Sequence, residues 1–520
     1  MSSGLGRFGQ DVSLYLLLII AISTLGPLQF GFHLGALNAP QDVITCAKKG
    51  MSLTTVVSAL LRRLSTTTTT TTTTTPASTT SFLSLPDCIP MTDAQFAIVS
   101  SIFTIGGLVG ALAAGPITSS RGRLTAMRLT GALYILGSLV ETVAGSIPLM
   151  ALGRLIVGVG AGGSTVIVPL YISEVSPPAS RGFFGAFTQI SINVGILIVQ
   201  TLGFFLSYGS AWRWILATGV FIAAGQTFGS FVMPESPAWL ATAKGDVAGA
   251  KRTLQRIRGH DVRVEDEVES WGEGDGEEIP TEEESLLREG EVSSAPSKGS
   301  GSHLGFVDVV KDPLYRPAII AVVGIMFAQQ LCGVNSIIMY SVSLLKDLLP
   351  INSALLTIII SAINLITTMA CSPLPDRLGR KTCLLLSIAG QGTSSLALAL
   401  SIMFGIKILS AISVLLFVAF FAVGLGPVPF IMASELVGQE AVGATQSWSL
   451  AANYVATFLV AQFFPIVNTA LNDRFGGAGW VYFIFAALSV LWGLFILWRV
   501  PETLGKKDAD EVWGRTRRLD

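Results

Sequence analysis

Charged side chains are scarce in this sequence, and their scarcity excludes an ordinary soluble protein. Asp, Glu, Lys and Arg account for 13% of its 520 residues, whereas hydrophobic residues account for 51%. Soluble domains are about 25% charged. The formal net charge of −1 excludes a basic nucleic-acid-binding protein. The five cysteines lack the spacing of metal ligands, so we expect neither a metal site nor a cofactor.

Long apolar segments recur along the sequence, and each is long enough to cross a bilayer. Candidate spans lie near residues 14–37, 93–115, 125–145, 149–173, 183–207, 212–233, 316–345, 352–374, 382–404, 408–434, 442–466 and 478–499. The first of them lacks a small-residue cleavage site, so we expect no cleavable signal peptide. The pattern predicts an all-α polytopic membrane protein with twelve transmembrane helices.

An even number of spans puts both termini on one side of the membrane. Lys and Arg cluster on that side, near residues 121–128, 244–258, 377–381 and 506–518. Because positive charge is enriched in cytoplasmic loops, we expect both termini to be cytosolic.

The first six spans and the last six repeat one another. Residues 115–124, after the second span, match residues 372–381, after the eighth. Glu174 ends the fourth span as Glu435 ends the tenth, and a Pro-Glu motif follows both the sixth and the twelfth. Near-equal offsets in separate loops indicate a duplicated six-helix unit. Two pseudo-symmetric bundles that rock about a midplane site are typical of secondary transporters.

This organisation divides the chain into four parts. We expect an N-terminal bundle over residues 1–240, a central cytosolic loop over 241–312, a C-terminal bundle over 313–500 and a short cytosolic tail over 501–520. A threonine-rich luminal loop occupies residues 41–91. The acidic, Gly/Ser-rich part of the central loop, residues 265–302, is expected to be disordered.

Three amide side chains stand inside the seventh span. Gln329, Gln330 and Asn335 would cost free energy in hydrocarbon, so they should face a protein interior or a wet cavity. On an ideal helix Gln330 and Asn335 are about 140° apart. A shared cavity therefore requires the helix to bend or unwind near Gly333. The alternative is that these amides only form hydrogen bonds between helices.

Two further polar stripes lie at helical spacing, one on the fifth span and one on the eighth. They consist of Gln189, Asn193 and Gln200, and of Ser361, Asn364 and Thr368. Neutral amides both donate and accept, which suits an uncharged polyhydroxyl ligand. An exporter of organic ions would need a charged residue in its cavity, and these stripes supply none.

Seven short motifs occur along the chain in a characteristic order. They are Gln29–Phe32, Gly153-Arg154, Glu174 through Pro177 to Arg181-Gly182, Pro234–Pro237, Gln329–Leu331, Asp376–Lys381 and Pro501–Thr503. Together they resemble the sugar porter family of the major facilitator superfamily over nearly every span. The resemblance implies a monomeric transporter, not an enzyme, that moves a monosaccharide such as a hexose by alternating access.

The resemblance also implies roles at matched positions. Sugar hydroxyls would be bound by Gln189, Gln329, Gln330, Asn335, Asn364 and Asn453. Phe430 and Tyr454 stand where glucose carriers have tryptophans, so the aromatic wall for the sugar ring has a changed shape.

The charged motifs at span ends would form a gate or latch, paired when the cytosolic side is closed and separated when it opens. The residues concerned are Glu174, Arg181, Glu235, Asp376, Arg377, Arg380, Glu435 and Glu502. Alternatively, they anchor loops and set the topology. Ser119 and Leu124 replace an acid and a base of the first copy, so we expect fewer ion pairs and a looser inward gate, although the second copy is intact.

Energy coupling depends on His33. In proton-coupled members of the family an aspartate occupies this position, near the arginine matched by Arg154. Desolvation beside a cation would keep the imidazole neutral, which favours facilitated diffusion. An acidic lumen could instead protonate it and give proton coupling. Glu141, the other acid within a span, is expected to reach the membrane interface. A further alternative is a sugar sensor, which binds the sugar without transporting it. Such sensors typically have a long cytosolic tail, whereas the tail beyond Pro501 is short.

Two insertions bear on location. Cys46 and Cys88 bracket the luminal loop and its threonine run, residues 66–75, so a disulfide is expected in an oxidising compartment. In the central loop, Glu282 with Leu286 and Leu287 resembles an acidic dileucine signal, which a sorting adaptor would bind. The alternative is a plain glutamate-rich linker. These features and His33 resemble a fungal vacuolar branch of the family, with the plasma membrane as the other location.

Overall fold

The computed structural model describes residues 13–47, 85–177, 180–259, 264, 308–345, 353–438, 441–506 and 509–514. Within these ranges the regular structure is entirely helical. The threonine run, most of the acidic part of the central loop, and Glu282, Leu286 and Leu287 fall outside the described residues.

The first half of the chain forms a series of long helices with short ones at their ends. The helices are α2 (Leu14–Ser23), α3 (Leu25–Gly35), α4 (Gln41–Ile44), α6 (Asp93–Arg121), α7 (Arg123–Thr142), α8 (Ile147–Val175), α9 (Arg181–Leu206), η2 (Gly209–Ala211), α10 (Trp212–Gly229), α11 (Pro237–Thr242) and α12 (Val247–Arg258). Side-chain caps fix some starts: Ser13 caps α2, and Thr92 with Gln95 forms a capping box at α6.

The second half repeats this arrangement. Its helices are α15 (Asp308–Lys311), α16 (Arg316–Leu331), α17 (Val334–Leu345), α18 (Ser353–Cys371), α19 (Leu374–Leu378), α20 (Arg380–Met403), α21 (Lys407–Val423), α22 (Val428–Glu435), α23 (Val442–Phe475), α24 (Val481–Arg499) and α25 (Ala509–Val512). Each of the twelve predicted spans falls on one of the long helices or on a consecutive pair.

In the part of the chain that the structure describes, nine helices are long and apolar enough to cross a membrane, or ten with the bent pair α16 and α17. The two remaining predicted spans are α7 and α10. Helix α7 carries Arg123, Arg128 and Glu141, and α10 is only 18 residues long.

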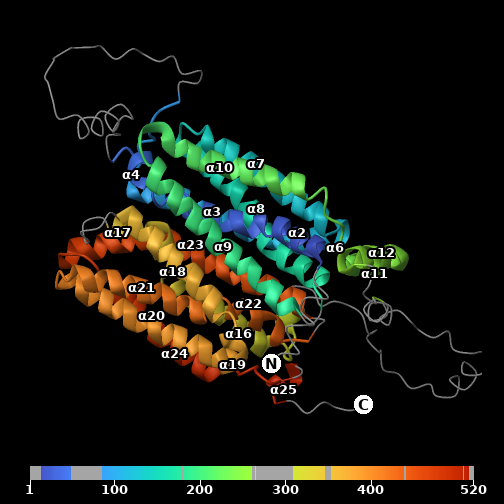
Figure 1. Ribbon diagram of the computed structural model, residues 1–520. Helices are drawn as coiled ribbons and strands as arrows, with labels where there is room; N and C mark the ends of the chain where they lie inside the picture. The colour runs from blue at the N-terminus through green and yellow to red at the C-terminus, as the bar shows by residue number, and fades with distance from the viewer. Residues whose placement is uncertain are drawn as a thin grey trace, which may run out of the picture.

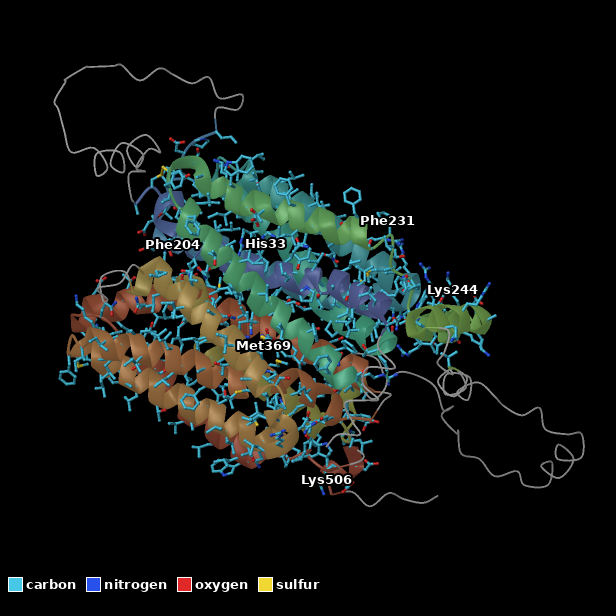
Figure 2. All side chains as sticks on the ribbon, viewed as in Figure 1. His33, Phe204, Phe231, Lys244, Met369 and Lys506 are labelled. Atoms are coloured by element: carbon cyan, nitrogen blue, oxygen red, sulfur yellow. A yellow bond between two sulfur atoms is a disulfide. The ribbon has the colours of Figure 1, made fainter. Side chains whose placement is uncertain are left out.

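Figure 1 shows two bundles side by side, one of α2 to α10 and one of α16 to α24. In the first bundle α8 packs against both α6 and α7, and in the second α20 packs against α21 and α24. The bundles meet mainly where α6 packs against α23 and α9 packs against α18, and α3 also contacts α17. Apolar side chains such as Phe231 and Met369, labelled in Figure 2, are 65% and 56% exposed on the outside. This outer surface suits lipid contact.

Glycines set the distance between α6 and α8. A Cβ added at Gly106 or Gly110 would overlap backbone atoms of α8, and one at Gly158 or Gly162 would overlap backbone atoms of α6. Small residues at this spacing let two membrane helices approach closely. These positions are packing sites.

The seventh predicted span is broken at Gly333. Helices α16 and α17 meet there at an angle of 41°. Gly333 has a φ of +102°, a conformation that glycine adopts without strain. The helix is therefore interrupted at Gly333, where the spacing of Gln330 and Asn335 predicted a bend.

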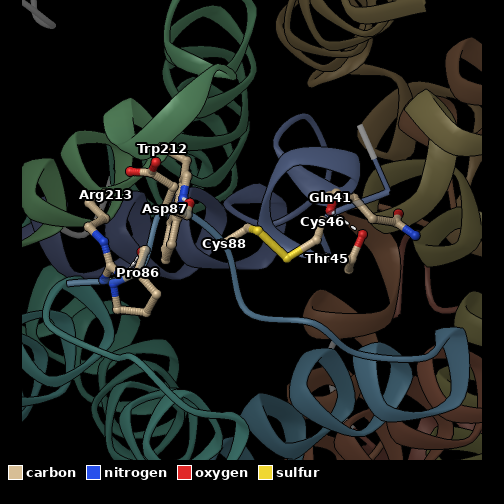
Figure 3. The surroundings of a disulfide bond; sticks show 8 residues. All are labelled: Gln41, Thr45, Cys46, Pro86, Asp87, Cys88, Trp212 and Arg213. Carbon is tan, nitrogen blue, oxygen red and sulfur yellow. Dashed lines mark hydrogen bonds between the residues drawn. A yellow bond between two sulfur atoms is a disulfide. The ribbon is translucent and has the colours of Figure 1, made fainter. Parts of the chain in front are cut away.

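The two ends of the molecule differ in chemistry. At one end, which we call the disulfide end, Cys46 is bonded to Cys88 (Figure 3). Arg213, at the start of α10, holds the chain beside this bond by donating from Nη2 to the Pro86 carbonyl at 2.8 Å. Trp212 Nε1 donates to the Asp87 carbonyl at 2.8 Å. The opposite end, the charged end, carries Arg123, Glu174, Arg380 and Glu435, together with α11, α12 and α25.

Candidate functional site

Four amide side chains form a continuous hydrogen-bonded group at the helix break. Gln329 and Gln330 end α16, Asn335 begins α17, and Asn453 lies on α23. Asn335 Nδ2 donates to Gln330 Oε1 at 2.6 Å, and Gln330 Nε2 donates to Gln329 Oε1 at 3.2 Å. Asn453 Nδ2 donates to the same Gln329 oxygen at 2.5 Å. We refer to these four residues as the amide group.

Surrounding helices complete the hydrogen bonding of the amide group. Gln329 Nε2 donates to the Leu425 carbonyl at 2.6 Å, in the break between α21 and α22. Asn335 Nδ2 lies 3.4 Å from Thr457 Oγ1 on α23. All four amides are at most 9% exposed. Buried amides require partners, so in this conformation the group also joins neighbouring helices of the second bundle.

The polar stripes of the fifth and eighth predicted spans meet across the boundary between bundles. Asn193 Nδ2 donates to Thr368 Oγ1 at 2.9 Å, and Asn364 Nδ2 donates to Asn193 Oδ1 at 3.4 Å. Gln189 Nε2 donates to the same Asn193 oxygen at 3.3 Å. Gln189 and Asn364, both predicted to bind sugar, are thereby linked through Asn193.

A small cavity lies beside the second of these sets of amides. Its lining includes Gln200, Val334, Ser361 and Asn364, and Val334 is the chain neighbour of Asn335. The cavity holds about 10 Å³, roughly one water molecule. Gln200 Oε1 is buried there, with no hydrogen-bond partner among the described residues. In this conformation the predicted sugar-binding amides bond to one another within each set, and this cavity is too small for a sugar.

The two aromatic residues predicted to form the sugar wall have different surroundings. Tyr454 is 3% exposed, and its hydroxyl lies 3.2 Å from Thr165 Oγ1 on α8. Its ring packs edge-on against Phe30, and a Cβ at Gly107 would overlap it. Tyr454 thus fills the contact between the bundles. Phe430, on α22, is 40% exposed and is not part of that contact.

Charged residues at the start of α7, at the end of α8 and just before α11 form one network in the first bundle. Arg123 binds Glu174 through two hydrogen bonds, Nη2 to Oε1 at 2.7 Å and Nε to Oε2 at 2.9 Å. Glu235 accepts from the backbone amides of Arg123 and Leu124 at 2.9 and 3.2 Å. With Ser119 in place of an acid, the pairs of Arg123 and Glu235 are still formed in this conformation.

The second bundle contains the matching network. Arg380 pairs with Glu435 and with Asp376, each at 2.9 Å from Nη2. Glu502 accepts from the backbone amides of Arg380 and Lys381 at 2.8 and 3.1 Å. All of these pairs lie within one bundle, so they fix the geometry of each half at the charged end.

One charged residue of these networks, Arg123, was missing from the residues that the motifs predicted for the gate. Arg123 is the counterpart of Arg380, and the alignment of residues 115–124 with 372–381 contains that match. Arg181, at the start of α9, and Arg377, on α19, are exposed at the charged end.

His33 lies in a buried polar cluster of the first bundle, where Figure 2 labels it. Arg154 does not contact the imidazole ring: its Nη1 donates to the His33 backbone carbonyl at 2.8 Å, and its guanidinium lies 4.6 Å from the centre of the Phe103 ring. Glu141 is fully buried, with Oε2 3.9 Å from His33 Nδ1. The expectation that Glu141 reaches the membrane interface is wrong, because α7 packs this position against α8 and turns it inward.

Comparison with known proteins agrees with the motifs. Residues 18–512 match a family model described as "Sugar (and other) transporter". A probable metabolite transport protein of Saccharomyces cerevisiae is 32% identical over 96% of this chain and 95% of its own length. The vacuolar protein sorting-associated protein 73 of the same yeast is 30% identical over 93% of each chain. The facilitated glucose transporter member 3 of Ovis aries is 29% identical over 94% of this chain and 90% of its own length.

A solved structure has the same fold. The xylose transporter XylE from E. coli, in a partially occluded inward open conformation, superposes with a TM-score of 0.70 at 21% identity. The match covers 95% of this chain and 100% of that one. XylE is described as a protein of the major facilitator superfamily. The fold class predicted from the sequence is therefore confirmed.

Proposed function

The chain belongs to the family of sugar and other transporters, and we propose on that premise that it carries a neutral monosaccharide, such as a hexose, across a membrane. Members of this family move a solute without changing it chemically, so the protein is a transporter and not an enzyme. The substrate is a small molecule, and the lipid bilayer is the surrounding medium.

The amide group is the single observation that carries the substrate class. Among the described residues, no hydrogen-bond partner of Gln329, Gln330, Asn335 or Asn453 is a charged side chain. A sugar offers hydroxyls that donate and accept, as amides do. Each amide–amide bond can therefore be exchanged for an amide–hydroxyl bond without leaving a buried group unpaired.

Alternating access follows from where the amide group lies. It stands at the break between α16 and α17, and a break lets the two helix pieces tilt independently. Asn193 on α9 and Asn364 on α18 meet across the boundary between the bundles. Rocking of one bundle against the other would part these residues, open the site on one side and admit a sugar.

We propose that transport is facilitated diffusion. An acid–arginine pair that protonation could break is missing at the first span, where Arg154 is held by a backbone carbonyl and by the Phe103 ring. Glu141 is the acid that acts electrostatically on this guanidinium among the described residues, but no ion pair joins the two, so protonation of Glu141 would break no direct bond to Arg154. Sugar movement would then follow the sugar gradient alone.

One observation favours the second candidate, a proton-coupled sugar symporter. Glu141 is buried beside His33, and neither of its carboxyl oxygens has a hydrogen-bond partner within the described residues. A buried acid in a membrane bundle is a candidate proton carrier. The two candidates therefore differ in whether Glu141 exchanges a proton during the transport cycle.

For location, we propose the vacuolar membrane, with the plasma membrane as the alternative. One relative is a vacuolar protein sorting-associated protein, and another is a facilitated glucose transporter. The acidic dileucine sequence at Glu282, Leu286 and Leu287 would bind a sorting adaptor on the cytosolic side. In this proposal both termini are cytosolic, the disulfide end faces the lumen, and the transporter acts as a monomer.

The test is uptake of a panel of labelled sugars into proteoliposomes containing the purified chain. We expect saturable uptake of at least one hexose, blocked by an excess of the same unlabelled sugar. A panel of labelled organic anions and cations is the matched control and should not be taken up. Sugar binding without uptake would replace the transporter by a sensor, and uptake of ions alone would overturn the substrate class.

A further inference from the structure

A second cavity opens at the disulfide end, separate from the amide group. It has a volume of about 320 Å³, at the lower limit of the ~300–1,000 Å³ typical of small-molecule sites. Asn468 and Asn472, which line it, lie on α23 beyond Asn453. At 1.5 Å per residue they are about 22–28 Å from Asn453 along the helix. The cavity therefore extends well beyond the predicted sugar site, although its wall residue Tyr340 is only five residues from Asn335 on α17.

The inner wall of this cavity is aromatic. Phe96, Tyr340, Phe464 and Tyr482 line it, and each is at most 5% exposed. The rings of Tyr340 and Phe464 stack with centres 5.8 Å apart, and Phe96 meets Tyr340 edge-on at 6.4 Å. Tyr340 is fixed by a hydrogen bond of 2.7 Å from its hydroxyl to the Ala461 carbonyl. A rigid aromatic wall offers a surface for the apolar face of a ligand.

The rest of the lining combines polar side chains with apolar residues such as Ile402 and Pro465. Asn468, Thr469, Asn472 and Gln41 contribute amide and hydroxyl groups. Among the described residues, Asp93 is the only charged one in the lining. Neutral amides and a hydroxyl beside an aromatic wall suit a neutral ligand that carries several hydroxyl groups.

We propose that this cavity is a second binding site for a neutral monosaccharide, which we call the vestibule site. The proposal rests on the function proposed above, because it assigns the ligand class of the transporter to a second place. The pyranose ring lies against Tyr340 and Phe464. Its hydroxyls form hydrogen bonds with the Thr469 hydroxyl and with the amide groups of Asn468 and Asn472.

Occupancy of the vestibule site affects transport because both bundles form it. Gln41, Asp93 and Phe96 come from the first bundle, whereas Tyr340, Phe464 and Asn472 come from the second. A sugar bound between them stabilises the arrangement in which the bundles are together at the disulfide end. High sugar concentration on that side therefore slows the opening of that end, and uptake falls below its maximum.

The test uses photo-crosslinking with a diazirine-bearing glucose on the purified full-length protein, followed by peptide mass spectrometry. Thr469→Trp fills the cavity from an exposed position, and Ala470→Trp places the same ring one residue away, outside the lining. Residues 464–482 are expected to be labelled in the wild type and in Ala470→Trp. Thr469→Trp is expected to lose that labelling and to retain labelling near residues 329–335.

The outcomes separate this proposal from the transport function. Labelling near 329–335 alone in the wild type overturns the vestibule site and leaves the transporter intact. Labelling at neither segment counts against both. Labelling of residues 464–482 that excess D-glucose does not displace, and that disappears on removal of lipid, assigns the cavity to a lipid headgroup and overturns the proposal. In proteoliposomes, Thr469→Trp should also abolish inhibition of uptake at high D-glucose, whereas Ala470→Trp should not.

Discussion

Gln330 occupies the middle of the amide group, since it donates to Gln329 and accepts from Asn335. Gln330→Ala removes both bonds and any bond to a sugar hydroxyl. We expect sugar affinity measured by calorimetry to fall by about 1–3 kcal/mol, the cost of a lost hydrogen bond in a partly dried site. Asn335→Ala should act in the same direction.

Gln391→Ala is the matched control, because Gln391 is a fully buried glutamine of the same bundle whose Nε2 bonds to Ser387. It should lower the melting temperature without changing sugar affinity. If Gln330→Ala and Asn335→Ala behave in the same way as this control, the amides serve only to hold helices together.

The ion-pair networks at the charged end give a second prediction at this scale. Glu435→Gln weakens a contact with Arg380, whose side chain is 13% exposed, and we expect a loss of about 1–3 kcal/mol of stability. Glu174→Gln should cost a similar amount, because Arg123 binds Glu174 with equivalent geometry. Thermal unfolding in detergent measures both.

Asp376→Asn is the control for these variants. The Asp376 side chain is 73% exposed, so its pair with Arg380 should contribute less than about 1 kcal/mol. A loss from Asp376→Asn as large as that from Glu435→Gln would contradict the view that burial decides the strength of these pairs.

Single residues were predicted from the sequence only where a pattern constrained them. The break at Gly333 followed from amide spacing, and Cys46 with Cys88 from their position around one loop. The inward orientation of Glu141 depends on how α7 packs against α8, and the residue pattern of a single helix does not specify that contact. Arg123 was missed although the internal repeat places it opposite Arg380.

At the scale of helices, the contact between α6 and α8 depends on glycine. A methyl group at Gly110 would overlap the Val159 carbonyl and force the two helices apart. We expect Gly110→Ala to destabilise the protein by about 1–3 kcal/mol, as overpacking does. Gly115 lies on the same helix with open space around it, so Gly115→Ala should be neutral or slightly stabilising. Melting temperatures in detergent distinguish the two.

Helix positions were accessible to sequence analysis because apolar length identifies a span, but contacts between spans were not. The polar stripes of α9 and α18 were predicted as faces. That Asn193 pairs with both Thr368 and Asn364 depends on how the bundles approach each other. Likewise, Tyr454 was expected beside a sugar, whereas in this conformation it packs against Phe30 of the other bundle. Such contacts change as the bundles move, and the same sequence must be compatible with each arrangement, so the sequence alone does not specify one set of contacts.

For the whole molecule, location gives a prediction that does not depend on the fold. Leu286→Ala with Leu287→Ala should divert the tagged protein from the vacuolar membrane to the plasma membrane, because both leucines are needed for adaptor binding. Fluorescence microscopy of the tagged chain measures this. Alanine at Val292, farther along the same acidic segment, is the control. Unchanged placement of the double variant would remove the sorting role and leave transport untouched.

Energy coupling is the property of the whole molecule on which His33 and Glu141 bear together. In a symporter, sugar movement drives a proton across the membrane through a group that is charged in one state and neutral in the other. In this chain Arg154 binds a backbone carbonyl, and Glu141 has only His33 within ion-pair distance among the described residues. A proton on Glu141 would therefore keep a buried carboxyl group uncharged. That role does not require Glu141 to release or take up a proton during transport.

The expected result is that sugar uptake moves no protons. Proteoliposomes that contain a pH-sensitive dye, with sugar added and no electrical gradient imposed, should show no sugar-driven change in internal pH. Glu141→Gln should retain uptake, because a neutral amide replaces a neutral acid of the same shape, and His33→Asn should do so as well. Sugar-driven acidification that disappears in either variant would overturn facilitated diffusion. It would make the His33 and Glu141 pair the proton carrier, since no other acid lies beside Arg154 among the described residues.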